Sequence, residues 1–251
     1  MGRAKEIIVK VIPAKIANEF IKKHHYSGKV VVKSSLHFGC FLDNKLHGVL
    51  SYGSPMVIRK AIPMVEGTGW NEMIELNRMA FDDYLPKNSE SRCISISIKL
   101  IRKNAPHIKW ILSYSDGSQC GDGTIYRASG FLLTSIKKNT TIYEFPDGFR
   151  VASNVLTSHN MSTNKMLARK YGAKLTGGAS TKPFQDVGAK LIEGYQLRYI
   201  YLIDKTCKIT VPILPFSRID ELGAGMYRGE RISLEERRAT LSEQVDSNAT
   251  S

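Results

Sequence analysis

Short apolar runs alternate with helical repeats through the first part of the chain. The run "KEIIVKVI" (residues 5–12) is rich in β-branched residues and predicts a strand. The next stretch, "PAKIANEFIKKHHY" (13–26), starts at a proline and spaces Ile16, Phe20 and Ile21 as one face of a helix. "HFGCFLD" and "KLHGVLSYG" flank a turn signal and predict a β-hairpin. The chain therefore opens with a βα unit and a hairpin.

The middle of the chain predicts two further strand and helix pairs. "NEMIELNRMAFDD" (71–83) predicts a longer strand, and "CISISIKLIRKNA" (93–105) a helix, although its serines and isoleucines alternate with the period of a strand. "KWILSYSD" predicts a strand and "GTIYRASGF" a short helix that ends at a glycine. "TTIYEF" (140–145) and "QLRYIYLID" (196–204) predict the last two strands. This order predicts an α/β (α+β) fold with a mixed central sheet flanked by helices.

A long segment, residues 150–190, separates the last two predicted strands and forms an insertion. Its centre, "STNKMLARKYGAK", predicts a basic helix that suits a phosphate backbone. We therefore expect one catalytic domain over residues 1–227, followed over 228–251 by a short helix and a disordered tail. The basic residues of the candidate DNA-binding element are Lys165, Arg169, Lys170 and Lys174.

Charge and cysteine usage narrow the class of partner. With 36 Lys and Arg against 23 Asp and Glu, the net charge is +13, which favours a polyanionic partner such as double-stranded DNA. The four cysteines lie far apart and form no CxxC pair, which argues against a zinc module and against a disulfide framework. No apolar run approaches the roughly 18 residues of a membrane span. We therefore expect a soluble, cytoplasmic protein.

The stretch "SYSDGSQCGDGTIYR" (113–127) concentrates candidate chemistry at the end of a predicted strand. Asp116 is placed to accept a proton from an amine or to hold a base, although an aspartate before a glycine is also a common turn former. The glycines would let a polynucleotide or a donor approach the backbone closely. Arg78 lies in a half-apolar strand, so its burial requires either a carboxylate such as Asp82 or a bound anion.

Two other sets of polar residues have both an ordinary and a functional interpretation. Ser89, Ser91 and Arg92 stand at a predicted helix start, where they suit either an anionic donor group or a plain helix cap. His24 and His25 are adjacent and point different ways from a helix, so they fit a polar helix end or a phosphate contact better than a two-ligand metal site. We assign no metal ligands, and a role for iron stays open.

Four fragments within residues 20–131 together carry a resemblance: "HHYSG", "GVLSYGSP", "ELNRMAFDDYLPKNSESR" and "SYSDGSQCGDGTIYRASGF". The chain resembles the Mom family of phage DNA-modification proteins, divergent relatives of the GNAT acyltransferases. The resemblance implies a phage or prophage enzyme that converts adenine in DNA to N6-carbamoylmethyladenine and so protects the DNA from restriction. It also implies a GNAT-like fold, in which the fourth and fifth strands splay apart and leave a wedge for an activated acyl donor.

The resemblance also implies roles for single residues. Tyr126 would act as the general acid, and Asp116 would serve the acceptor adenine as a catalytic residue. Arg78 would hold the donor or its phosphate in the wedge. Tyr52, at the end of the "GVLSY" strand, is a further family-type position that would stack on an extruded base, although tyrosines are equally common in protein cores.

The donor is open between acetyl-coenzyme A and an activated glycine such as glycyl-tRNA. The chain lacks the glycine-rich pyrophosphate loop typical of GNAT enzymes, and an acetyl group carries no nitrogen for the implied product. A glycyl group has the required atoms, because N6-glycyladenine and N6-carbamoylmethyladenine are isomers. Two other functions stay open: a GNAT-type N-acyltransferase that acts on a protein or tRNA amine, and a DNA-binding protein without catalysis.

Overall fold

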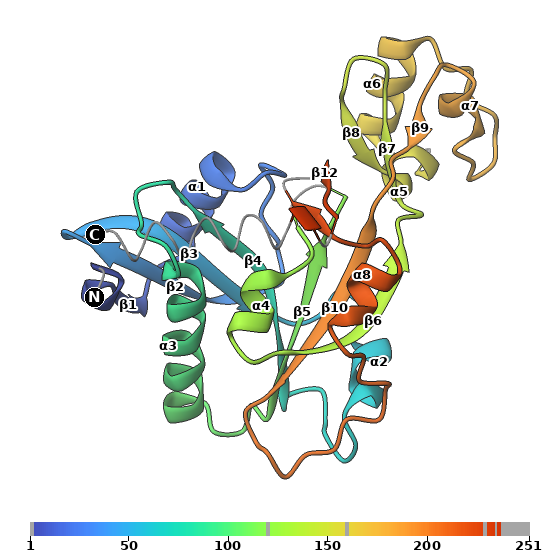
Figure 1. The fold of residues 1–251 in the computed structure, drawn as a ribbon. Helices are drawn as coiled ribbons and strands as arrows, with labels where there is room; N and C mark the ends of the chain where they lie inside the picture. The colour runs from blue at the N-terminus through green and yellow to red at the C-terminus, as the bar shows by residue number, and fades with distance from the viewer. Residues whose placement is uncertain (1–2, 119–120, 159–160, 228–229, 234, 237–251) are drawn as a thin grey trace.

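The chain folds around a seven-stranded mixed sheet (Figure 1). The computed structural model describes residues 3–118, 121–158, 161–227, 230–233 and 235–236. In the order β1-β2-β3-β4-β5-β10-β6, neighbouring strands are antiparallel except β4 and β5, which are parallel. The strands are β1 (Ile8–Val11), β2 (Ser34–Leu42), β3 (Lys45–Gly53), β4 (Met73–Phe81), β5 (Trp110–Asp116), β6 (Leu132–Lys138) and β10 (Tyr195–Leu202). The expected α/β fold, a mixed central sheet flanked by helices with an insertion before its last strand in the chain, is confirmed.

Helices cover both faces of this sheet, and each face has its own apolar core. On one face, Ile21 of α1 (Ala14–His24) packs with Val49 and Ala80 of the strands beneath it. On the other, α3 (Ser89–Asn104) and α4 (Thr124–Ala128) add Ile94 and Tyr126 to a larger core. We call these the α1 face and the α3 face. Successive residues of a strand point to opposite faces of the sheet. A strand residue that belongs to one of these cores therefore shows which face its neighbours along the strand point to.

Shorter elements complete the body of the molecule. Most of residues 228–251, where we expected a helix and a tail, lies outside the described residues. No helix in the described part of the chain is long and apolar enough to cross a membrane. The short elements are η1 (Arg3–Glu6), α2 (Ile58–Ala61), η2 (Ile62–Met64), α8 (Ser217–Glu221), β11 (Met226–Tyr227) and β12 (Glu230–Arg231).

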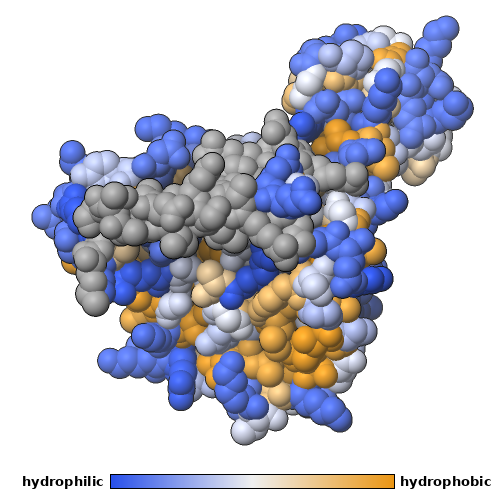
Figure 2. Space-filling view, viewed as in Figure 1, coloured by the Kyte–Doolittle hydropathy of each residue, from blue (hydrophilic) through white to orange (hydrophobic). Residues whose placement is uncertain are grey.

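Residues 142–191 form a lobe that projects from the body beyond β6 and β10 (Figure 1). Phe145, Leu156, Leu167 and Phe184 belong to an apolar core of its own, separate from the cores of the main sheet. The visible surface of the lobe is mostly hydrophilic, whereas apolar surface gathers on the body below it (Figure 2). Its elements are β7 (Ile142–Glu144), β8 (Arg150–Ala152), α5 (Ser153–Thr157), α6 (Ser162–Tyr171), α7 (Lys182–Gln185) and β9 (Lys190–Leu191).

The structure corrects one strand assignment. "TTIYEF" does form a strand, β7, but it pairs with β8 and β9 in the lobe and not with the main sheet. The sixth strand of the main sheet is instead β6, which the sequence reading missed. In "LLTSIKK" adjacent leucines break the alternation, and two exposed lysines, Lys137 and Lys138, end the strand at the edge of the sheet.

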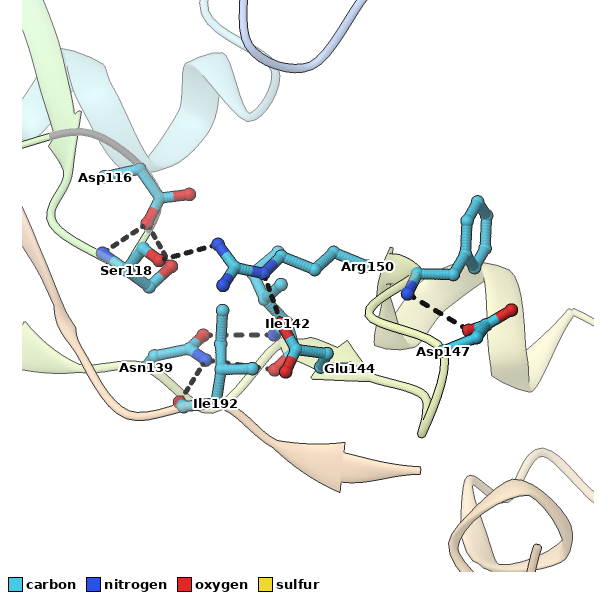
Figure 3. Close-up of polar contacts among 9 residues, drawn as sticks. Asp116, Ser118, Asn139, Ile142, Glu144, Asp147, Arg150 and Ile192 are labelled. Atoms are coloured by element: carbon cyan, nitrogen blue, oxygen red, sulfur yellow. Dashed lines mark hydrogen bonds and ion pairs between the residues drawn. The ribbon is translucent and has the colours of Figure 1, made fainter. Parts of the chain in front are cut away.

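Asn139 ties the two connections of the lobe together (Figure 3). Its Nδ2 donates to the carbonyls of Ile142 at 3.1 Å and Ile192 at 2.9 Å. Its Oδ1 accepts from the amides of Thr141 and Ile142, both at 3.0 Å. The amide of Asn139 donates to the carbonyl of Gly194 at 2.8 Å. One buried side chain therefore satisfies backbone groups on both the entering and the leaving strand.

We predict that Asn139→Ala lowers the free energy of unfolding by about 1–3 kcal/mol, because it leaves buried backbone groups without partners. For a chain of this size that corresponds to a melting temperature lower by about 3–10 °C. Asn154→Ala is the matched control, since Asn154 is exposed and, within the described residues, hydrogen bonds reach only its backbone carbonyl, which the variant keeps. Equal melting temperatures for the two variants would contradict the role of Asn139.

Candidate functional site

The parallel pair β4 and β5 stays together over four residues and then parts. Its register runs from Met73 opposite Trp110 to Leu76 opposite Ser113. At that last pair, Ser113 Oγ donates to the carbonyl of Leu76 at 3.1 Å. Beyond it, β4 continues along β3 to Phe81, and β5 continues along β10 to Asp116. The implied wedge is therefore present between Asn77–Phe81 and Tyr114–Asp116.

Tyr52 lies on the α3 face and is fully buried. Its hydroxyl shares a 2.7 Å hydrogen bond with Ser97 Oγ of α3, and its ring meets Phe38 edge to face at 5.9 Å. Burial is the main cause that raises the pKa of Tyr52 above its usual value. In this arrangement the ring has no free face for an extruded base, so Tyr52 does not serve the stacking role expected of it.

Tyr126 also lies on the α3 face, in the first turn of α4. Its ring packs against Phe131 at 5.4 Å and Tyr199 at 5.2 Å. Gly123 precedes the helix with φ of +83°, and a Cβ there would lie 2.5 Å from the Tyr199 ring. The close approach that requires this glycine is thus made by Tyr199 rather than by a polynucleotide or a donor, and it fixes where Tyr126 stands.

Asp116 ends β5 on the opposite, α1 face, because Trp110 and Leu112 of the same alternating set pack in the core around α2 on that side. Asp116 Oδ1 accepts from the amide of Ser118 at 3.1 Å and from its hydroxyl at 2.5 Å (Figure 3). With this oxygen Asp116 stabilises a turn, which is the common role of an aspartate before a glycine. The structure places Asp116 and Tyr126 on different faces of the sheet.

The lobe touches this turn through Arg150 of β8. Its Nη1 donates to the carbonyl of Ser118 at 3.5 Å, while its Nε pairs with Glu144 at 2.6 Å (Figure 3). After the turn, the buried Asp122 forms an ion pair of 2.9 Å with Arg127, which the sequence reading did not single out. Both contacts hold the loop between β5 and α4 in place.

Arg78 lies on the α1 face, where its strand partner is Ser51. Its guanidinium donates to the carbonyls of Lys29 at 3.1 Å and Asn77 at 2.8 Å. Asp82, the carboxylate partner considered from the sequence, pairs with His47 at 2.9 Å instead. Among the described residues no carboxylate lies in salt-bridge range of Arg78, and two backbone carbonyls hold its guanidinium instead.

Three further polar residues continue this cluster, and sequence reasoning missed them: Glu75 interacts with Arg78, Tyr114 with Glu75, and Arg198 with Tyr114. Glu75 precedes the point of parting on β4, and Tyr114 and Arg198 are direct cross-strand partners on β5 and β10. Burial raises the pKa of Glu75 to about 7, against the opposing effect of Arg78. The β3–β4 register skips Asn77 between Leu76 and Arg78, so Glu75 and Arg78 share the α1 face, and alternation puts Tyr114 and Arg198 there too. We call Glu75, Arg78, Tyr114 and Arg198 the wedge cluster; a carboxylate inside the strand "MIELNRMAF" was its visible signal.

The adjacent histidines lie beside this cluster but differ in environment. His25 Nδ1 accepts from the amide of Ser27 at 3.1 Å, and burial together with Arg78 lowers its pKa to about 4. His25 is therefore neutral near pH 7, which suits a polar helix end. His24 stacks on Phe20 at 4.3 Å. The described residues contain no group of three His, Cys, Asp or Glu placed to hold a metal ion.

The residues assigned to the donor at the start of α3 are turned toward their own chain. Ser89 Oγ donates to the carbonyl of Pro86, and Ser91 Oγ donates to that of Asn88 at 3.2 Å. Arg92 Nη2 donates to the carbonyl of Lys5 at 3.0 Å. Neither hydroxyl caps the helix, because both donate to carbonyls of the preceding residues and α3 has no side-chain cap at Asn88. The three side chains do not converge on one anion site.

The basic helix is α6, on the lobe. Lys165 and Arg169 are exposed and line an open groove of about 500 Å³ with Gly172 and Leu175. Lys170 pairs with Asp147 at 2.7 Å, which raises the pKa of Lys170 and offsets its charge. Lys174 is exposed. Residues 139–194 hold seven Lys and Arg against four Asp and Glu, so most of the excess positive charge lies on the body.

Comparisons with known proteins place this chain in a family. The sequence pattern of the Mom protein family matches residues 6–218. Methylcarbamoylase mom of Escherichia phage Mu is 39% identical over 145 residues, which cover 56% of this chain and 58% of that protein. The alignment therefore spans less than two thirds of the relative's length.

Solved structures with similar folds are acetyltransferases at low sequence identity. Spermidine/spermine N-acetyltransferase SpeG from Vibrio cholerae has a TM-score of 0.43 at 8% identity, with 82% of this chain and 97% of that chain covered. The ribosomal-protein-S18-alanine N-acetyltransferase from Escherichia coli has a TM-score of 0.42 at 10% identity, with coverages of 78% and 94%. Because the family match spans most of the 251 residues, this chain belongs to the Mom protein family.

Proposed function

We propose that the protein is a phage DNA-modification enzyme that builds N6-carbamoylmethyladenine in double-stranded DNA and thereby blocks restriction. Membership of the Mom family supports DNA modification, and the name methylcarbamoylase of the phage Mu relative supports this product. The observation that carries the proposal is the parting of β4 and β5, which leaves backbone groups and ionisable side chains around one opening. An acyl group held there meets polar groups from both faces of the sheet.

The chemistry requires an activated donor, because the lone pair of the adenine N6 amine is delocalised into the ring. Backbone groups of the parted strands orient the acyl group. Tyr126 supplies a proton to the leaving group, and Asp116 holds the amine of the acceptor base. Duplex adenine is stacked, so the base must be extruded before it reaches these groups.

Atom balance favours a donor that already carries nitrogen. Transfer of a glycyl group to N6 followed by rearrangement gives the carbamoylmethyl isomer with no oxidant and no external nitrogen. Acetyl transfer would need both an oxidation and a separate amination. Since the side chains at the start of α3 are engaged with their own backbone, we derive no step from a diphosphate bound there. A glycine activated on tRNA is the donor that we propose.

Mass spectrometry of nucleosides from DNA of expressing cells tests the function and the donor together. With glycine labelled at nitrogen and both carbons, we expect an adenosine adduct that retains all three labels. An adduct whose carbons follow labelled acetate would exclude the glycyl donor but keep the function. Unmodified adenosine would favour the alternatives, an N-acyltransferase for protein or tRNA amines or a DNA-binding protein without catalysis.

Variants at the two proposed site residues should lose DNA modification but keep their fold. Tyr126→Phe removes a proton donor and should lower the adduct level by about 10²- to 10⁴-fold. Asp116→Asn keeps an oxygen for the Ser118 turn but loses the charge, and should lower it by about 10- to 100-fold. Tyr195→Phe, a buried tyrosine of the same core, is the matched control. Near-normal adduct in either site variant, at an unchanged melting temperature, would remove that residue from the mechanism.

We expect the groove on α6 to bind part of the phosphate backbone of the duplex. Lys165→Ala with Arg169→Ala should flatten the slope of log affinity against log salt by about 1.8, because each lost phosphate contact contributes about 0.9. The double change Lys205→Ala with Lys208→Ala removes the same charge from the connection that follows β10, at the end of the sheet opposite the lobe (Figure 1). Equal slopes in the two double variants would place the DNA surface elsewhere.

A further inference from the structure

A carboxyl group without a partner stands at the mouth of the wedge. Glu75 is half-buried, yet among the described residues its carboxylate has no hydrogen bond and no ion pair. Two other half-buried carboxylates of the body do have partners: Asp82 pairs with His47 and Glu72 pairs with Lys109. A group that is partly desolvated and unmatched is held ready for a partner that the chain itself does not supply.

An exposed aromatic ring lies next to that carboxyl group. Tyr114 is 46% exposed, while the adjacent residues Ser113 and Ser115 are buried. Arg198 lies across from it on β10 and is fixed by hydrogen bonds from its Nε to Thr134 Oγ1 at 2.9 Å and from its Nη2 to the Thr134 carbonyl at 3.1 Å. Partial burial, and then the nearby carboxylate of Glu75, raises the pKa of the Tyr114 phenol. An open ring beside a carboxylate offers stacking and a hydrogen-bond acceptor together.

The rim of this cluster is basic. Lys22 and Lys23 are exposed in the last turn of α1, and the carbonyl of the exposed Lys29 holds Arg78. Positive charge around a site with an aromatic ring and a carboxylate suits one base of a polynucleotide, because the phosphates on either side of the base can meet the lysines. It does not suit a small cationic amine.

We propose that the wedge cluster on the α1 face is the site for the extruded adenine, with Tyr114 stacking on the ring and Glu75 accepting the N6 proton. This inference rests on the proposed function and names the acceptor side of the same reaction. It assigns the stacking role expected of Tyr52 to Tyr114, which the structure exposes. It also separates two tasks that were both open for Asp116: Asp116 holds the amine and Glu75 takes its proton.

The step balances without oxidation or reduction. N6 forms a bond to the acyl carbon of the activated acyl ester, and the bond from that carbon to the leaving oxygen breaks. The N6 proton passes to the Glu75 carboxylate, and the leaving oxygen takes the proton of the Tyr126 hydroxyl. Because Glu75 lies on the α1 face and Tyr126 on the α3 face, the proton acceptor and the proton donor stand on opposite sides of the wedge.

The pH dependence follows from the groups around Glu75. Its pKa of about 7 means that the carboxylate needed as a base is lost as the pH falls below about 7. Arg78 and Tyr114 face it, and Arg198 and His25 stand behind those two; His25, with a pKa of about 4, is already neutral in this window. The rate of adduct formation should therefore rise with pH through about 7 and level off above it.

Variants of the full chain test the assignment, with adduct level measured in the DNA of expressing cells. Glu75→Gln should lower the adduct by about 10²- to 10⁴-fold, and Glu75→Asp should retain part of it. Glu72→Gln, on a carboxylate that pairs with Lys109, is the matched control and should leave the adduct level unchanged. In clarified lysate of wild-type cells, adduct formation on an added duplex oligonucleotide should show the rise near pH 7. A flat pH profile, or a normal adduct level in Glu75→Gln, would overturn the role of Glu75.

Tyr114 is tested separately by DNA affinity, measured as fluorescence anisotropy of a labelled duplex oligonucleotide. Tyr114→Ala should weaken binding by about 10- to 100-fold, whereas Tyr114→Phe keeps the ring and should bind normally. Equal affinities for both would overturn the stacking role. This readout needs no donor, so it still decides the base site if wild-type cells give no adenine adduct. If they do give the adduct while both Glu75→Gln and Tyr114→Ala behave as wild type, only this inference fails.

Discussion

The parting of β4 from β5 after four paired residues is the constraint on which the rest of the site depends. Each strand is held more strongly by its other neighbour: β4 pairs with β3 as far as Phe81, and β5 pairs with β10 along its whole length. A bulge in the β3–β4 register, between Ser51 and Tyr52, turns β4 at the level where the parallel pairing ends. The opening is therefore built into the sheet and does not need a ligand to form.

The same parting divides the ionisable groups between two faces. Tyr52 and Tyr126 lie in the apolar core beneath α3 and α4, and burial is the main cause that raises the pKa of Tyr52. Glu75, Arg78 and Tyr114 lie on the α1 face, which is more polar and has a basic rim. In the proposed reaction the leaving group gains a proton and the nucleophilic amine loses one. The two faces of the sheet at the wedge provide different environments for these two proton transfers.

Sequence reasoning was most successful where a pattern is local. The β-branched runs predicted β1 to β5, and the proline at residue 13 marked the start of α1. It missed β6, because Leu132 and Leu133 break the alternation, and it could not assign β7 to the lobe, because pairing partners are not local. For the same reason it could not decide between a core position and a stacking role for Tyr52, and it overlooked Glu75 and Tyr114. Exposure at a wedge depends on where two strands stop pairing, and neither strand carries that information alone.

The base of the lobe, at Asn139, lies between the proposed DNA-binding helix α6 and the proposed reaction site on the sheet. Asn139 fixes the entering strand against the leaving one, so the lobe has a defined direction relative to the edge of the sheet. Arg150 reaches from β8 to the carbonyl of Ser118, the residue whose amide and hydroxyl hold Asp116. In the proposed complex, a duplex held by α6 contacts the same lobe that reaches this turn through Arg150. Because the turn ends β5, the strand that bounds the wedge, this hydrogen bond joins the lobe to the edge of the proposed acceptor site.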